Sequence, residues 1–175
     1  MANKTYIIFI LIVFSGCYNK PEAIDTEVVT DRDYYPVFHN LVDNSRESIY
    51  FVMYISKLSQ NNETYYLFQD LVNARGRGVE IKILLDSSSY DNDLNTANTA
   101  FAESLGRYNI EVRFDAPNKT THAKFGIFDH RKSLIGSTNW TMSALERNHE
   151  ANILIDSREI ATQLEEYFFS IWEEK

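Results

Sequence analysis

A histidine and a lysine two residues apart, His122 and Lys124, have the types and spacing of a pair that could cleave a phosphate ester. We expect a strand from His122 to Phe128. Alternate side chains on a strand face the same way, so the imidazole and the ammonium would stand side by side. A neutral imidazole is a nucleophile near pH 7, and a lysine offsets negative charge on non-bridging phosphate oxygens. The pair therefore indicates attack on a phosphodiester.

A second group of polar residues follows the next short strand. Gly136 allows close approach of the backbone, Ser137 offers a hydroxyl donor, and Asn139 offers an amide donor two residues later. Together with Lys124 they could form a clamp for a phosphate oxyanion that needs no metal. Because no other cluster of carboxylates or histidines has the spacing of metal ligands, we expect neither a metal nor another cofactor.

These residues fit one pattern, His-x-Lys-x4-Asp-x6-Gly-Ser-x-Asn, which runs from His122 to Asn139. The pattern resembles the HKD signature of the phospholipase D superfamily at every fixed position. The resemblance implies that His122 forms a covalent phosphohistidine. It also implies that Lys124 and Asn139 hold the phosphate and that Ser137 assists.

Two acidic residues complete the set of catalytic candidates. The resemblance implies that Asp129, within the pattern, has mainly a structural or charge-balancing role. Glu150 stands where members of the superfamily carry an acid that hydrogen-bonds the nucleophilic histidine. We therefore expect a hydrogen bond between Glu150 and His122.

The chain carries one such motif. His39 and His149 lack the lysine two residues later, and His130 lacks the acid that must follow its lysine. A double displacement needs a nucleophile and a general acid, and one motif supplies one imidazole. We therefore expect a homodimer whose two-fold axis brings both His122 side chains into one shared active site.

The elements around the motif alternate between strands and helices. Strands are expected at 28–29, 48–55, 79–85, 110–114, 122–128, 133–135 and 152–155, and helices at 34–42, 63–75, 94–105 and 158–172. This order predicts an α/β sandwich with a mixed sheet flanked by helices. It also resembles the small single-motif members of the superfamily, which include bacterial endonucleases and mitochondrial cardiolipin hydrolase-like enzymes.

The first residues differ from the rest of the chain. A wholly apolar run from Tyr6 to Phe14 follows Lys4, and small residues lead to Cys17, the one cysteine of the chain. This order predicts a signal peptide over residues 1–17, and Cys17 resembles the lipidated cysteine of bacterial lipoproteins. We expect a tether at 18–26, a catalytic domain at 27–175, and an exported protein that is periplasmic or anchored to a membrane.

The charge of the chain is unevenly distributed. Its formal net charge is −8, and an acidic surface does not by itself recruit a polyanion. Between Arg113 and Arg147, however, six basic residues stand against three acidic ones. We therefore expect a locally basic surface around the motif.

Three functions from different classes fit these observations. The first is a nonspecific endonuclease that cuts DNA or RNA, favoured by the single motif and the basic stretch. The second is a phospholipase D or cardiolipin hydrolase, favoured by an anchor that would keep the enzyme on its lipid substrate. The third is a non-catalytic binding or structural module, and the intact motif argues against it. We rank the endonuclease first.

Overall fold

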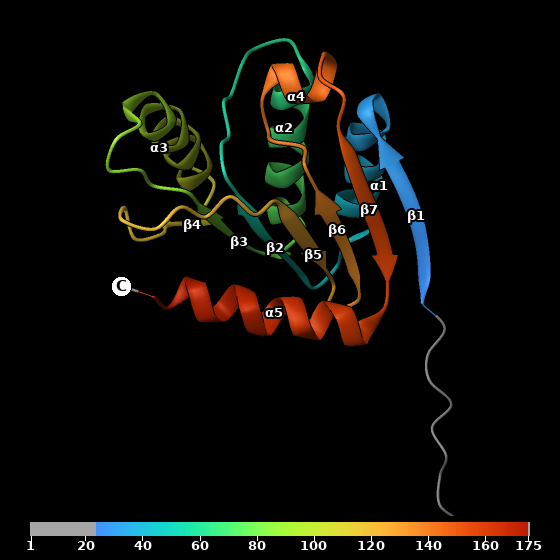
Figure 1. The fold of residues 1–175 in the computed structure, drawn as a ribbon. Helices are drawn as coiled ribbons and strands as arrows, with labels where there is room; N and C mark the ends of the chain where they lie inside the picture. The colour runs from blue at the N-terminus through green and yellow to red at the C-terminus, as the bar shows by residue number, and fades with distance from the viewer. Residues whose placement is uncertain (1–23, 175) are drawn as a thin grey trace, which may run out of the picture.

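The computed structural model describes residues 24–174, which form one seven-stranded sheet with helices on both faces (Figure 1). The strands are β1 (Asp25–Thr30), β2 (Ser48–Met53), β3 (Glu80–Leu85), β4 (Glu111–Phe114), β5 (Phe125–Phe128), β6 (Lys132–Gly136) and β7 (Ala151–Asp156). The helices are η1 (Asp31–Asp33), α1 (Tyr34–Asn44), α2 (Glu63–Gly76), α3 (Asn92–Gly106), α4 (Met142–Glu146) and α5 (Arg158–Trp172).

The sheet contains both parallel and antiparallel pairs. Its strand order is β1-β7-β6-β5-β2-β3-β4. Strands β2, β3 and β4 run parallel, with α2 and α3 as their connections. From β2 through β5, β6 and β7 to β1, each neighbouring pair is antiparallel. The expected α/β class with a mixed sheet is confirmed.

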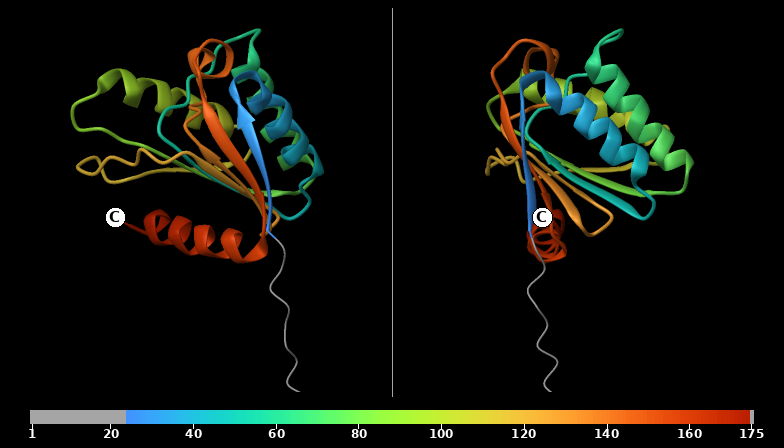
Figure 2. Two further views of the ribbon diagram at one scale, coloured as in Figure 1. Left: turned by 45° about the vertical axis from the view of Figure 1, so that its right-hand side comes forward. Right: turned by 90° about the vertical axis from the view of Figure 1, so that its right-hand side faces the viewer.

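The two faces of the sheet bury separate hydrophobic cores. Along β2, Phe51 contributes to the core formed with α1, α2 and α3, whereas Tyr50 and Val52 point to the other face and pack under α5. This alternation follows from the two-residue period of a strand. Figure 2 shows α5 on the side of the sheet opposite α1 and α2.

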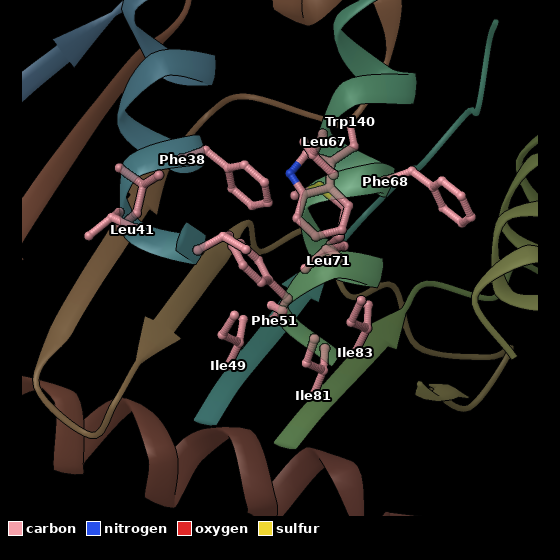
Figure 3. Close-up of a cluster of buried hydrophobic side chains, with 14 of the residues drawn as sticks. Phe38, Leu41, Ile49, Phe51, Leu67, Phe68, Leu71, Ile81, Ile83 and Trp140 are labelled. Atoms are coloured by element: carbon pink, nitrogen blue, oxygen red, sulfur yellow. The ribbon is translucent and has the colours of Figure 1, made fainter. Parts of the chain in front are cut away.

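An aromatic cluster fills the larger core and reaches the motif (Figure 3). The ring centroids of Phe51 and Trp140 lie 4.6 Å apart, and that of Phe38 lies 5.7 Å from each. Gly126 of β5 lies against the Phe51 ring, where an added Cβ would be only 2.2 Å from a ring carbon. Because Trp140 directly follows Asn139, the core anchors the end of the motif.

The structure differs from the expected elements at several places. Strand β1 begins at Asp25, so residues 25–26 of the expected tether belong to the sheet. Two short helices, η1 and α4, were not expected. The expected signal segment, with Cys17, and the first part of the tether lie outside the described residues. No helix within residues 24–174 has the length and apolarity needed to cross a bilayer.

The described chain enters the sheet at the end away from the histidine of the motif. Asp25 of β1 pairs with Asp156 of β7. Asp156 also pairs with Lys132 of β6, and Lys132 pairs with Phe128, the last residue of β5. These four residues therefore lie at the same end of the sheet. His122 lies before the first residue of β5. Whatever precedes residue 24 therefore joins the domain at the opposite end of the sheet from His122.

Candidate active site

His122 and Lys124 lie in the segment that leads into β5, and their side chains are in contact. The Lys124 Nζ is 3.1 Å from Nδ1 and 3.2 Å from Nε2 of His122, and it donates to the His122 carbonyl oxygen at 2.7 Å. The predicted start of the strand was wrong: β5 begins at Phe125, because the ladders with both neighbouring strands end at this residue. The imidazole and the ammonium are nevertheless side by side.

The surroundings favour the neutral imidazole. Burial lowers the pKa of His122 below its ordinary value, and the positive charge of Lys124 lowers it further. Burial also lowers the pKa of Lys124, while the negative charges of Glu150 and Asp86 oppose this. At neutral pH the pair therefore consists of an uncharged nucleophile beside a cation.

The turn after β6 brings the second half of the motif next to Lys124. The Gly136 amide donates to the Lys124 carbonyl oxygen at 3.1 Å. Gly136 also faces Asn152 of β7 so closely that an added Cβ would lie 2.1 Å from the Asn152 Oδ1. The buried Asn152 amide accepts from the Thr138 backbone at 3.3 Å and donates to the Thr138 hydroxyl at 2.9 Å. Asn152, which the sequence analysis missed, thus fixes the residue between Ser137 and Asn139.

Asn139, the last residue of the motif, has an unsatisfied polar atom. Its Oδ1 is buried, and no other described residue hydrogen-bonds to it. A buried amide oxygen without a partner costs free energy on the order of 1–3 kcal/mol. Such a group calls for an explanation, and the atom of this side chain that could donate to a phosphate oxygen is its Nδ2.

Glu150 does not bond to His122 as expected. Its carboxylate accepts from the Ser137 hydroxyl and, at 3.0 Å, from the Asn148 side chain. The Ser137 hydroxyl oxygen in turn accepts from the Ala151 amide at 3.1 Å. The structure therefore places Glu150 beside Ser137, close enough to Lys124 for its charge to act on the ammonium.

Asp129 lies at the other end of β5 from the reacting pair. The four residues of β5 alone span roughly 13 Å. Its Oδ1 accepts from the backbone amides of Arg46, Glu47 and Ser48 at 2.8–3.1 Å. Asp129 thus ties the β5–β6 turn to the start of β2, and it does not contact His122.

A buried acid outside the motif, Asp86, supports the segment before His122. Asp86 follows β3 directly and is 1% exposed. Its Oδ1 accepts from the Thr121 amide at 2.6 Å. Burial raises the pKa of Asp86 to about 6; the Thr121 bond opposes this rise, and Asp115 adds to it. The Asp115 Oδ2 is buried without a partner. The sequence analysis did not select Asp86. The signal that could have identified it is an acidic residue directly after an apolar strand.

The remaining histidines have other surroundings. His39 of α1 pairs with Asp70 of α2 at 2.9 Å, and His130 pairs with Glu165 of α5 at 2.7 Å. His149 is fully exposed. Across residues 24–174, no group of three or more His, Cys, Asp or Glu side chains is placed to hold a metal ion. Of the four histidines, His122 is the one in contact with the lysine of the motif.

The basic surface expected around the motif does not form. Arg131 and Lys132 lie beyond the far end of β5 and pair with Asp156. Arg113 and Lys119 each pair with a glutamate. The prediction was wrong because the β5–β6 hairpin divides a stretch that is continuous in the sequence between two ends of the sheet.

The sequence of this chain is similar to a known family and to named proteins. The family model described as cardiolipin synthase, PLD-like domain, matches residues 38–172. The phospholipase D of Rickettsia bellii is 33% identical over 147 residues, which cover 84% of this chain and 63% of that protein. The mitochondrial cardiolipin hydrolase of Xenopus tropicalis is 31% identical over 98 residues, covering 56% of this chain and 44% of that protein. The chain thus spans less than two thirds of either relative.

Solved structures share the fold. Nuc, a phospholipase D family member from Salmonella typhimurium, superposes with a TM-score of 0.72 at 22% identity, covering 87% of this chain and 96% of that one. NucT from Helicobacter pylori gives a TM-score of 0.70 at 19% identity, covering 87% and 98%. At these identities the likeness concerns the fold alone.

The raised pKa of Asp86 predicts how stability depends on pH. The folded chain keeps this proton up to about pH 6, whereas the unfolded chain releases it near the ordinary pKa of about 4. The folded state therefore binds more protons between these values, and its stability falls as pH rises through that window. Asp86→Asn should remove this pH dependence. Measured against wild type, the free energy of unfolding of Asp86→Asn should be higher at pH 7 than at pH 4 by on the order of 1–2 kcal/mol.

Urea unfolding between pH 4 and pH 8 measures the effect. Asp93→Asn, which changes an exposed acid in the first turn of α3, is the matched control and should keep the wild-type pH dependence. An Asp86→Asn curve parallel to the wild-type curve would show that Asp86 does not titrate in this window.

Proposed function

The chain belongs to the PLD-like domain family of phosphodiesterases, and from this premise we propose that it hydrolyses phosphodiester bonds through a covalent phosphohistidine on His122. The observation that carries the proposal is the contact between the His122 imidazole and the Lys124 ammonium. A nucleophile and a cation meet at one place. This is the arrangement needed to attack phosphorus and to hold the phosphate oxygens.

The reaction has two steps. One imidazole nitrogen of His122 bonds to phosphorus while the bond to the leaving oxygen breaks, and a general acid gives that oxygen its proton. Water then attacks phosphorus and gives a proton back to the group that acted as general acid; the phosphorus–nitrogen bond breaks, and a phosphomonoester and the free imidazole result. Lys124 and Asn139 hold the non-bridging oxygens in both steps, and the Ser137 hydroxyl, oriented by Glu150, assists.

The general acid comes from a second copy of the chain. Of the other histidines, His39 and His130 are held by acids away from the site, and His149 is fully exposed beside Asp31. A homodimer with His122 from each copy at one two-fold axis supplies both roles. The mechanism uses no metal ion, because Lys124 and Asn139 provide the charge and the hydrogen bonds that a metal would otherwise contribute.

The preferred substrate is nucleic acid. The segment before residue 24 joins the sheet at the end opposite His122, and β1 alone spans roughly 20 Å between these ends. A tether that holds this end at a membrane would direct the site away from the bilayer and toward soluble polymers. Phospholipid is the second candidate, favoured by the relatives named phospholipase D and mitochondrial cardiolipin hydrolase.

The function is tested by offering the mature protein single-stranded DNA, double-stranded DNA, RNA, cardiolipin vesicles and phosphatidylcholine vesicles, all with excess chelator. We expect cleavage of nucleic acid, and its complete loss in His122→Asn. Lys124→Ala should reduce kcat/KM by on the order of 10² to 10³, because a charged donor to the transition state is lost.

Acid trapping of wild-type protein with labelled substrate should place the phosphoryl group on His122. Turnover of lipid alone would make the second candidate correct. Activity that disappears with chelator and returns with a divalent ion would contradict metal-free hydrolysis. A label on serine would contradict the assigned nucleophile.

The shared site is tested with a mixed dimer. If each reaction needs one neutral and one protonated His122, a dimer of one wild-type and one His122→Ala chain should be nearly inactive. Differently tagged chains allow the heterodimer to be purified and assayed. A heterodimer of wild-type and His149→Ala chains is the control and should keep full activity. Activity near half of wild type in the His122→Ala heterodimer would mean that each chain carries a complete site.

The proposed location is outside the cytoplasmic membrane, with lipid on Cys17 after removal of the preceding residues. We expect the intact mass of the protein from its native cell to show a lipidated Cys17 at the mature N-terminus, and Cys17→Ser to release the protein from the membrane fraction. An unmodified Cys17 behind an intact Met1 would refute both the anchor and the cleavage.

A further inference from the structure

Tyr54 contacts both reacting side chains, although it lies outside the motif. It follows the last residue of β2 and is partly buried. The centroid of its ring lies 4.5 Å from that of the His122 imidazole, with 58° between the planes. The Lys124 Nζ lies 5.0 Å from the same ring centroid. The Tyr54 ring therefore forms one wall of the space that the pair occupies.

The position of Tyr54 is fixed by a buried amide. Asn98 of α3 is fully buried, and its Nδ2 donates to the carbonyl oxygens of Tyr54 and Asp86, each at 2.9 Å. Its Oδ1 accepts from the Ser56 amide at 2.8 Å. One side chain thus ties the end of β2 to the end of β3. Because Asp86 in turn holds the Thr121 amide, the same network reaches the segment that carries His122.

We propose that Tyr54 is a positioning residue whose ring confines the His122 imidazole and excludes water from one side of it, so that the imidazole stays neutral and ready to attack. The inference rests on the proposed function and adds a residue to its machinery. An imidazole packed against an aromatic ring loses part of its hydration, and loss of hydration disfavours the charged form. The same ring face attracts the Lys124 ammonium and offsets part of the cost of burying it.

The charges around the imidazole fit this role. Lys124 from the same segment disfavours a positive charge on His122, whereas the negative charges of Glu150 before β7 and Asp86 after β3 favour the charged form of Lys124. Burial is the largest cause of the lowered His122 pKa, ahead of Lys124. Burial, together with Asp86, also raises the pKa of the Tyr54 hydroxyl, so Tyr54 is uncharged at neutral pH. Its effect on His122 is therefore one of packing rather than of charge.

Two substitutions separate the ring of Tyr54 from its hydroxyl. Tyr54→Phe keeps the ring and should keep kcat/KM and its pH profile. Tyr54→Ala removes the ring, and kcat/KM at pH 6 should fall by on the order of 10- to 100-fold, because a displaced reacting group loses rate steeply. The acid limb of the profile should also move to higher pH, since the His122 pKa returns toward its ordinary value. Tyr108→Ala is the matched control, because it removes a half-exposed ring that packs on Phe68, and it should change neither quantity.

NMR titration of the His122 imidazole in the apo protein gives a readout that needs no substrate. The His122 pKa should be higher in Tyr54→Ala than in wild type and unchanged in Tyr54→Phe. An unchanged pKa and an unmoved acid limb in Tyr54→Ala would overturn the inference even if activity fell. Equal loss in Tyr54→Phe would also overturn it, because the hydroxyl would then be the active part. An active His122→Asn would instead refute the proposed function and leave the titration result standing.

Discussion

An imidazole held within 3.1 Å of a lysine ammonium is the constraint on which the candidate site depends. Two positive charges at that distance repel strongly wherever water is partly excluded. The Lys124 side chain is almost completely buried, at 8% exposure of the residue. Burial first and the ammonium second therefore keep the imidazole of His122 neutral, and the carboxylates of Glu150 and Asp86 favour the charged form of the lysine. Removing either carboxylate or the lysine would disturb the other groups as well.

The β5–β6 hairpin explains the fixed spacing of the motif. At its closed end, Asp129 and His130 adopt positive φ values of 49° and 54°, a conformation that Asp tolerates in turns. The Asp129 carboxylate then accepts from three backbone amides at the start of β2, those of Arg46, Glu47 and Ser48. At its open end, the Gly136 amide reaches the Lys124 carbonyl oxygen. Asp129 thus fixes the closed end of the hairpin, and the candidate site residues lie at its open end.

Two glycines link this hairpin to the rest of the domain. Gly126 lets the Phe51 ring lie against β5, and Gly136 lets Asn152 reach the backbone around Thr138. Any larger side chain at either position would collide with atoms that the core holds in place. The geometry of the site is therefore not set by surface loops alone. It depends on the packing of the aromatic core on one side and on the β7 ladder on the other.

The sequence alone was sufficient for the motif, the α/β class and most of the elements, because these depend on residue types and on periods of two and 3.6 residues. It also identified His122 and Lys124 as neighbours, although β5 begins only at Phe125. The contact needs only local geometry, because the two residues are two positions apart and the long lysine side chain reaches back to the ring.

Only the tertiary structure decided which residues surround that pair. Tyr54 and Asp86 directly follow β2 and β3, which are far from the motif in sequence, and the strand order places β2 beside β5 and β3 beside β2. The expected basic surface failed for the same reason, because the hairpin carries Arg131 and Lys132 to the opposite end of the sheet. Glu150 bonds to Ser137 rather than to His122, since the register of β7 on β6 sets which groups meet. Spacing along a chain determines which side chains share a strand, whereas strand order and register determine what they face.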